Sequence, residues 1–135
     1  PLLTLDETLL NRVEAYAEMG KYEEALADIN MFYSTKIRNY VASQHVVTLD
    51  KIRTFFSESD PKKGLIETIL QAKKAEFLQE GLRWLDIVRK DLPVKHNVIN
   101  TEGIETDLVL EPGDPRRVFQ IPEEATIAGI ELNPR

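Results

Sequence analysis

One run of seven residues, EGLRWLD at positions 80–86, constrains the fold of this chain more than any other. It contains three charged side chains, the single tryptophan and a glycine, and it ends an amphipathic stretch that begins near Pro61. Glycine ends helices because it adopts positive φ angles without a steric penalty. The run therefore predicts that one helix stops and another starts here, with acidic and guanidinium groups carried toward apolar neighbours.

Two amphipathic stretches at the start of the chain predict an antiparallel helical hairpin over residues 1–36. Thr4 or Asp6 can cap the first helix, and Gly20 can end it. Small and aromatic residues recur at tetratricopeptide spacing, where they interlock two helices. The residues at this spacing are Tyr16, Gly20, Tyr22 and Ala25.

The middle of the chain shows a mixed, polar segment followed by helical patterns. Residues 37–47 are predicted to form a loop. Thr48 can cap a short helix, and Asp60 can cap a long one with Pro61 in its first turn, where the missing N–H costs nothing. We expect the long helix to end at Gly81 with a positive φ. Residues 61–90 are therefore predicted to form two paired helices.

Beyond Pro93 the pattern changes to short β-type runs separated by turn residues, the last of them at 118–121. This pattern predicts a strand hairpin and a C-terminal tail over residues 93–135. Taken whole, the chain is expected to be mostly α with a small β hairpin.

The composition narrows the kind of ligand. A net charge of −6 and a pI near 5.0 argue against nucleic acid, because phosphate binding needs clustered Lys and Arg. A neutral ligand such as a glycan suits a chain of net negative charge better. The chain has no cysteine, and His45 and His96 lie outside any metal-ligand pattern. We expect no cofactor, no metal and, without a run of about 18 apolar residues, no membrane span.

Glu76 and Glu80 stand four positions apart, and paired carboxylates are what a glycosidase needs. A catalytic pair, however, normally comes from opposite walls of a cleft. Acids on adjacent turns of one helix are more often neutralised by a neighbour such as Lys73, Arg83 or Lys90, so we favour a structural ion network. The chain has no nucleophile elbow, phosphate-binding glycine loop or thiol nucleophile. It therefore predicts no enzyme and no catalytic residue.

The charged and aromatic groups of the 80–86 run are expected to be structural. Arg83 can present a fork of N–H donors to a carboxylate, so we expect Glu80, Arg83 and Asp86 to join the two helices. Trp84 could stack on a sugar ring, but the helical phase that it shares with Leu85 favours packing in the seam between them. The predicted structural motif consists of Glu76, Glu80, Arg83, Trp84 and Asp86.

Asn39, Tyr40 and His45 are candidates for contact with a sugar. With Tyr33 they lie in or near the segment 33–47, and aromatic and amide groups on a loop are what a sugar-binding surface requires. Loops also carry such residues without any binding role, so both interpretations stay open.

The run at 80–86 with its flanks resembles the C-terminal region of the SusD/RagB family of outer-membrane nutrient-binding lipoproteins. Two further similarities follow in the expected order: residues 5–26 resemble the last tetratricopeptide-like hairpin of the family, and residues 114–122 resemble its closing strand. The chain departs from the family pattern at Ala72, Lys73, Lys74 and Phe77. The matching residues are Ile69, Leu70, Glu76, Glu80, Gly81, Arg83, Trp84, Asp86 and Arg89.

The resemblance implies both a fold and a function. The implied fold is a tetratricopeptide-like hairpin followed by SusD-like C-terminal helices and closing strands, with this chain as the C-terminal part of a longer protein. The implied function is binding of an oligosaccharide, from starch or another glycan, at the outer-membrane surface during polysaccharide utilisation. A lipidated cysteine upstream of Pro1 would anchor the protein beside a SusC-like TonB-dependent transporter. These residues would supply scaffold, since ligand contacts in the family vary by loop.

A second hypothesis is a tetratricopeptide-type interaction module whose groove takes a protein segment. It uses only residues 5–32, leaves the 80–86 run unexplained and needs more than one repeat. The upstream sequence discriminates between the two hypotheses. Further repeats of about 34 residues would favour the module, whereas a signal peptide with a lipidation cysteine would favour the lipoprotein.

Overall fold

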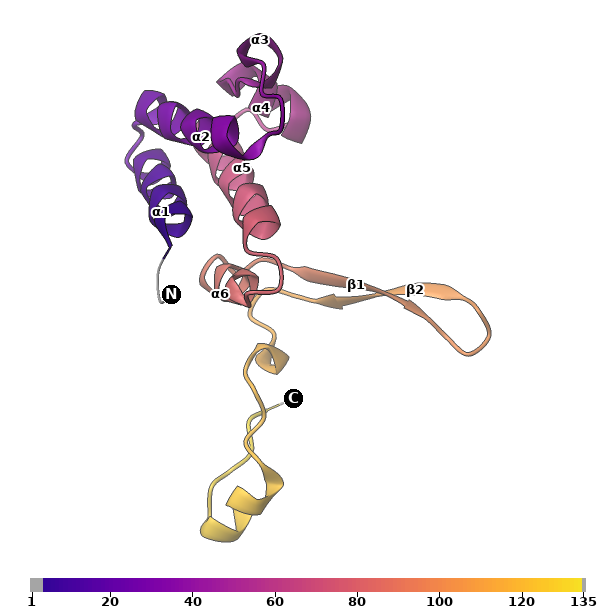
Figure 1. Cartoon of the computed structure of the whole chain (residues 1–135). Helices are drawn as coiled ribbons and strands as arrows, with labels where there is room; N and C mark the ends of the chain where they lie inside the picture. The colour runs from indigo at the N-terminus through magenta and orange to yellow at the C-terminus, as the bar shows by residue number, and fades with distance from the viewer. Residues whose placement is uncertain (1–3, 135) are drawn as a thin grey trace. The chain divides into compact units, whose positions relative to one another are not determined.

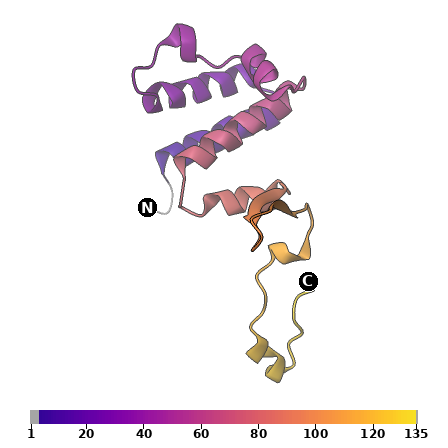
Figure 2. The ribbon, with the colours of Figure 1, turned by 90° about the vertical axis from the view of Figure 1, so that its right-hand side faces the viewer.

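The computed structural model describes residues 4–134, and its backbone packing divides the chain after Gln79 into two compact units. Figures 1 and 2 show the course of the chain in two views. The described residues form six α-helices, two 3₁₀-helices and one two-stranded antiparallel sheet. The predicted mostly α fold with a small β hairpin is therefore confirmed.

Helices α1 (Leu5–Glu18) and α2 (Tyr22–Lys36) pack together as the predicted hairpin. Thr4, one of the two caps considered, accepts a hydrogen bond at its Oγ1 from the N–H of Glu7 at 3.1 Å. Gly20 has a φ of 74°, which lets the chain reverse within a short turn. The first helix thus begins after Thr4 and ends shortly before Gly20, as the sequence predicted.

Helices α4 (Leu49–Phe56) and α5 (Pro61–Glu76) also begin where their caps predict. The Thr48 hydroxyl and the Asp60 carboxylate each accept a hydrogen bond from a backbone N–H in the first turn, at 3.3 and 2.9 Å. Capping is a local interaction between neighbouring residues, so the sequence reveals it well.

Helix α3 (Ala42–His45) is a single turn within the segment that the sequence predicted as a loop, and that prediction was wrong there. The turn is closed by a hydrogen bond from the N–H of Val41 to Nδ1 of His45 at 2.8 Å. A helix of four residues is too short for a hydrophobic period to appear, so no pattern in the sequence indicates it.

Helix α5 ends at Glu76, earlier than the predicted end at Gly81. Gly81 does have a positive φ, 78°, but it serves as the N-cap of α6 (Leu82–Arg89). Gln79 also takes a left-handed conformation, with a φ of 70°. Leu78, which follows the end of α5, is exposed.

The hydrophobic core of the first unit is formed by residues from helices α1, α2, α4 and α5 and by Phe77. The stripes that the sequence shows on these helices supply nearly all of it. The buried apolar residues are Leu10, Val13, Ala17, Ala25, Ile29, Phe32, Ile52, Leu65, Ile69, Leu70, Ala72 and Phe77.

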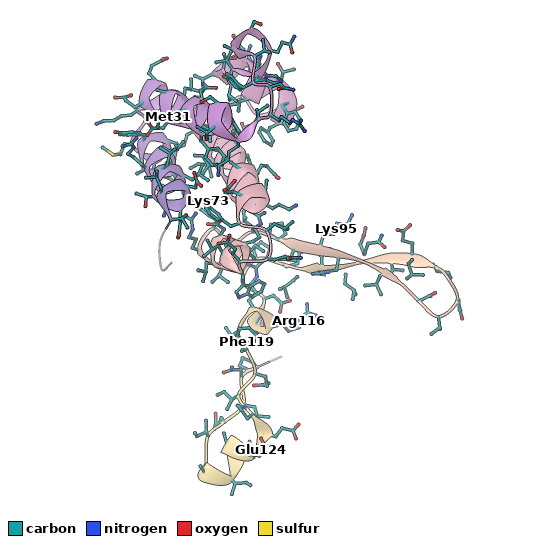
Figure 3. The ribbon with its side chains drawn as sticks, viewed as in Figure 1. Met31, Lys73, Lys95, Arg116, Phe119 and Glu124 are labelled. Atoms are coloured by element: carbon teal, nitrogen blue, oxygen red, sulfur yellow. The ribbon has the colours of Figure 1, made fainter. Side chains whose placement is uncertain are left out.

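A charged pair lies inside this core, between α1 and α5. Nζ of Lys73, labelled in Figure 3, donates hydrogen bonds to Oε2 of Glu14 at 2.9 Å and to Oδ1 of Asn11 at 2.7 Å. The Lys73 and Glu14 side chains are only 8% and 9% exposed. Buried ions are tolerated only when they are paired and hydrogen-bonded, so this contact favours one alignment of the two helices.

The second unit contains the antiparallel hairpin of β1 (Val94–Ile99) and β2 (Glu105–Leu110). Val94 pairs with Leu110 and Ile99 with Glu105, so the strands are in full register. Oδ1 of Asn100 accepts hydrogen bonds from the N–H groups of two turn residues, at 2.9 and 2.8 Å, which holds the turn. The predicted strand hairpin is confirmed.

The buried side chain of Arg117 bonds several backbone carbonyls of the second unit. Its guanidinium donates to the carbonyls of Leu92 at 2.5 Å and Glu111 at 2.8 Å, with a longer bond to Leu110 at 3.2 Å. It also lies 3.4 Å from the Asp91 carboxylate. One buried side chain therefore ties the segment after α6 to the end of β2.

The predicted closing strand is not a strand. Residues 115–117 form the 3₁₀-helix η1 (Pro115–Arg117), and the following residues run to a second 3₁₀-helix, η2 (Glu123–Ala128), without a ladder partner. The side chains of Gln120 and Asn133 bond the two arms of this loop together, at 2.8 to 3.1 Å. Side-chain bonds thus take the place that strand pairing was predicted to fill.

Lys73→Met should lower the free energy of unfolding by about 3–5 kcal/mol, because the buried Glu14 carboxylate would lose its hydrogen-bonded ion pair with Lys73. Replacing both charges, in Glu14→Leu with Lys73→Met, should recover most of that loss. Urea denaturation measures both variants. Lys74→Met at the exposed neighbouring lysine is the matched control and should change stability by less than about 0.5 kcal/mol. Equal losses for the single and double variants would contradict the proposed role of the pair.

The contribution of Asp114 to the stability of the fold should depend on pH. The side-chain hydrogen bond from Arg116, with the backbone N–H of Arg116 and its charge, lowers the pKa of Asp114 to about 2. A lowered folded-state pKa means that this contact stabilises the fold above the ordinary carboxyl pKa and is lost as the pH falls toward 2. Carbon-detected NMR titration of Arg116→Ala should show the pKa of Asp114 moving upward, whereas Arg53→Ala, in the first unit, should leave it unchanged.

Candidate functional site

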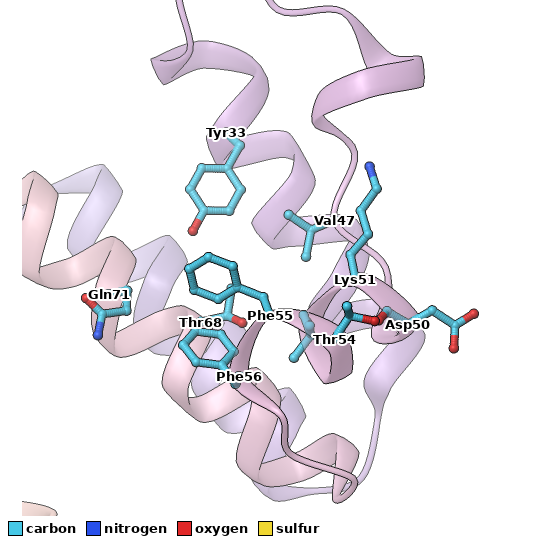
Figure 4. Close-up of a pocket in the computed structure, with 10 residues that line it drawn as sticks. Tyr33, Val47, Asp50, Lys51, Thr54, Phe55, Phe56, Thr68 and Gln71 are labelled. Atoms are coloured by element: carbon cyan, nitrogen blue, oxygen red, sulfur yellow. The ribbon is translucent and has the colours of Figure 1, made fainter.

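An open groove of about 900 Å³ lies in the first unit, lined by residues of α2, α4, α5 and the segment before α4 (Figure 4). Ligand sites are typically hollows of about 300–1,000 Å³ with mostly apolar walls and a few polar groups. The groove has this character, and it is our candidate site. The residues that matter most below are Tyr33, Val47, Ile52, Phe55, Phe56 and Gln71.

The position of α4 against α5 depends on Gly64. A Cβ at this position would lie 2.5 Å from Cγ2 of Ile52, which is closer than two carbons can approach. Gly64 lies in the first turns of α5, where a glycine is tolerable. The structure gives it a packing role, which offsets its helix penalty of about 1 kcal/mol. Because Ile52 also lines the groove, this contact sets how far apart the groove walls stand.

Two phenylalanines at the end of α4 give the groove an aromatic surface. The rings of Phe55 and Phe56 meet edge to face, with centroids 4.8 Å apart and planes at 85°. Phe55 is nevertheless 79% exposed. Consecutive side chains on a helix point in different directions, so the pair cannot both enter the core. Phe56 supports the ring of Phe55 while most of that ring faces solvent.

Most polar side chains of the groove are already engaged within the chain. The hydroxyls of Thr54 and Thr68 donate to helix carbonyls four residues earlier, at 2.8 and 2.9 Å. Lys51 donates to two backbone carbonyls in and after α3, at 2.9 and 2.7 Å. Asp50 pairs with Arg53 at 2.9 Å. These groups have little capacity left for a charged ligand.

Tyr33 and Gln71 are different, because neither side chain has a hydrogen-bond partner among residues 4–134. Burial raises the pKa of the Tyr33 phenol, so the hydroxyl stays protonated at physiological pH. In Figure 4 this hydroxyl points toward the side of the groove where the Phe55 ring lies. The groove therefore combines an aromatic ring, a neutral hydroxyl and a neutral amide.

The three predicted sugar-contact residues lie outside this groove. The rings of Tyr40 and His45 come together, with centroids 5.5 Å apart, and Asn39 adopts a left-handed conformation with a φ of 57°. Of the residues considered with them, Tyr33 is the one that lines the groove. Phe55 and Phe56, whose edge-to-face rings form the aromatic surface of the groove, were not among the predicted sugar-contact residues.

Glu76 and Glu80 do not share a helix face, because α5 ends at Glu76. Glu76 accepts a hydrogen bond from Nζ of Lys36 at 2.6 Å, and the same ammonium group reaches Asp6 at 2.8 Å. The cation that neutralises Glu76 thus comes from α2, a partner that sequence spacing did not suggest. Glu80 is exposed.

Asp86 is 6% exposed and accepts hydrogen bonds from the guanidinium of Arg89, one turn further along α6, at 2.6 and 2.9 Å. Trp84 is half-buried. One Nη of Arg83 is buried and has no hydrogen-bond partner within the described residues. The joining role of Glu80, Arg83 and Asp86 stays a prediction.

Residues 4–134 contain neither a set of metal ligands nor a membrane-spanning helix. No group of three or more His, Cys, Asp or Glu side chains is placed to hold a metal ion there. Within the same residues no helix has the length and apolar character needed to cross a bilayer.

A mostly helical chain with an open, largely apolar groove and few free polar groups has the character of a binding protein. Comparison with known families identifies which one: the model of the SusD family matches residues 1–124, and the chain belongs to this family. In general, members of this family are glycan-binding lipoproteins that serve nutrient uptake at the outer membrane. No curated protein and no solved structure matches the chain.

Gly64→Ala should destabilise the chain by about 1–2 kcal/mol, because overpacking against Ile52 outweighs the gain in helix propensity. Urea denaturation measures the change. Ile52→Ala removes the obstructing methyl, so adding Gly64→Ala to that variant should cost nothing further. A Gly64→Ala chain more stable than the parent would show that α4 does not need the close approach.

Proposed function

We propose that the full-length protein captures a neutral oligosaccharide at the cell surface and passes it to a SusC-like TonB-dependent transporter. In this proposal a lipid anchor upstream of this chain holds the protein at the outer membrane, and the chain supplies scaffold. The observation that carries the proposal is membership of the SusD family over residues 1–124.

The charge of the chain supports a neutral ligand. The net charge is −6, and the lysines and arginines around the groove are already paired with carboxylates or backbone carbonyls. A polyanionic ligand would meet repulsion from the acidic chain without a free cation in the groove to compensate. A glycan without charged groups avoids that cost.

We propose binding without turnover. Hydrolysis of a glycosidic bond needs two carboxyl groups on either side of the sugar, about 5–10 Å apart. The pair that the sequence raised for this role, Glu76 and Glu80, lacks the arrangement, since Glu76 is held by Lys36 at 2.6 Å. The family is one of binding proteins, which agrees with this proposal.

A tetratricopeptide-type interaction module remains the second candidate. The α1–α2 hairpin with its buried Ala17 and Ala25 favours it, since small residues let two such helices approach closely. The family match extends far beyond this hairpin, however, and a single repeat cannot cover its own apolar face. The binding lipoprotein therefore accounts for more of the chain.

The full-length protein should bind at least one member of a panel of neutral hexasaccharides built from glucose, mannose or xylose, as measured by isothermal titration calorimetry. Chromatography of the same mixtures after overnight incubation should show intact sugar. Heparin is the charged control and should not bind. Cleaved products, or binding of heparin alone, would contradict the proposal.

A further inference from the structure

The groove of the first unit points to a role for this chain in ligand contact as well as scaffold. All of its lining residues belong to residues 33–71, which lie within one compact unit, so its shape depends on contacts inside that unit. Its walls are held by the Gly64–Ile52 approach and by the edge-to-face contact of Phe55 with Phe56. A hollow with fixed walls can select a ligand by shape.

The exposed ring of Phe55 calls for an explanation. A large aromatic side chain that stays in water forgoes the favourable free energy of its burial. The neighbouring ring of Phe56 restricts how Phe55 can turn, so little rotamer freedom remains to be lost on binding. A flat ligand face with C–H groups would cover Phe55 favourably.

The two free polar groups decide between an apolar and a hydroxylated ligand. An apolar helix seated in the groove would bury the Tyr33 hydroxyl and the Gln71 amide without partners, and each group would lose its hydrogen bonds to water without replacement. A sugar ring presents an apolar face to an aromatic side chain and hydroxyls around its edge. Those hydroxyls can both donate to and accept from Tyr33 and Gln71.

We propose that this groove is a contact site for a neutral sugar ring, a hexose or a pentose, of the bound oligosaccharide. The sugar ring stacks on Phe55, and its hydroxyls bond to Tyr33 and Gln71. This inference rests on the proposed function and adds a site within this chain to it. Because Tyr33 stays protonated and no charged group of the groove is free, contact at this site does not depend on pH between about 5 and 8.

The test uses the full-length protein and the hexasaccharide that it binds most tightly in the panel above. Phe55→Ala should raise the Kd about tenfold, and Tyr33→Phe and Gln71→Leu should each raise it about three- to tenfold. Tyr33→Phe keeps the ring and removes only the hydroxyl, so it reports on the hydrogen bond even if Phe55→Ala disturbs folding. Thermal unfolding of each variant without sugar is measured alongside.

Two matched controls lie outside the groove. Phe119→Ala removes another highly exposed phenylalanine, 87% exposed, and Tyr22→Phe removes another tyrosine hydroxyl from α2. Both should leave the Kd unchanged.

Three results would overturn the inference. Unchanged sugar affinity in Tyr33→Phe and Phe55→Ala would overturn it while the proposed function stands. A lower melting temperature for Phe55→Ala with unchanged affinity would show that protein covers the groove, which also overturns it. If the parent protein binds no sugar of the panel, the proposed function itself fails, and the site fails with it.

Discussion

The buried ion pair of Lys73 with Glu14 is the contact on which the arrangement of the first unit depends. Apolar side chains tolerate small slides of one helix past another, but two buried charges do not, because a slide would separate the ammonium group of Lys73 from the Glu14 carboxylate. With α1 and α5 aligned in this way, Gly64 on α5 receives Ile52 of α4. That approach in turn shapes the groove in which Phe55 and Tyr33 lie.

The second unit is organised differently. Among its described residues, 80–134, the buried side chains are Asp86 and Arg117, whereas the apolar residues of its hairpin and tail are exposed or half-buried. Arg117 compensates by satisfying carbonyls after α6 and at the end of β2. A guanidinium suits this task because its N–H donors point in several directions from one rigid plane. Polar bonds thus hold together what an apolar core holds in the first unit.

The sequence predicted the parts of this fold that depend on neighbours along the chain. The caps Thr48 and Asp60 and the turn at Gly20 bond to residues a few positions away, and each lies where it was expected. The misses were of another kind. The turn α3 is too short to show a hydrophobic period. The end of α5 and the loop that replaced the closing strand are not marked by such a period either, and the loop is held by bonds between residues far apart in the sequence, such as Gln120 and Asn133.

By itself, the sequence determined the mostly helical class, the β hairpin and the resemblance to the SusD/RagB family, because these rest on hydrophobic period, turn residues and motif order. Only the tertiary structure decided that Glu14 faces Lys73, that Glu76 meets Lys36, and that Phe55 remains exposed beside Tyr33 and Gln71. The reason is distance along the chain. These partners come from separate helices, and their meeting depends on how the helices pack.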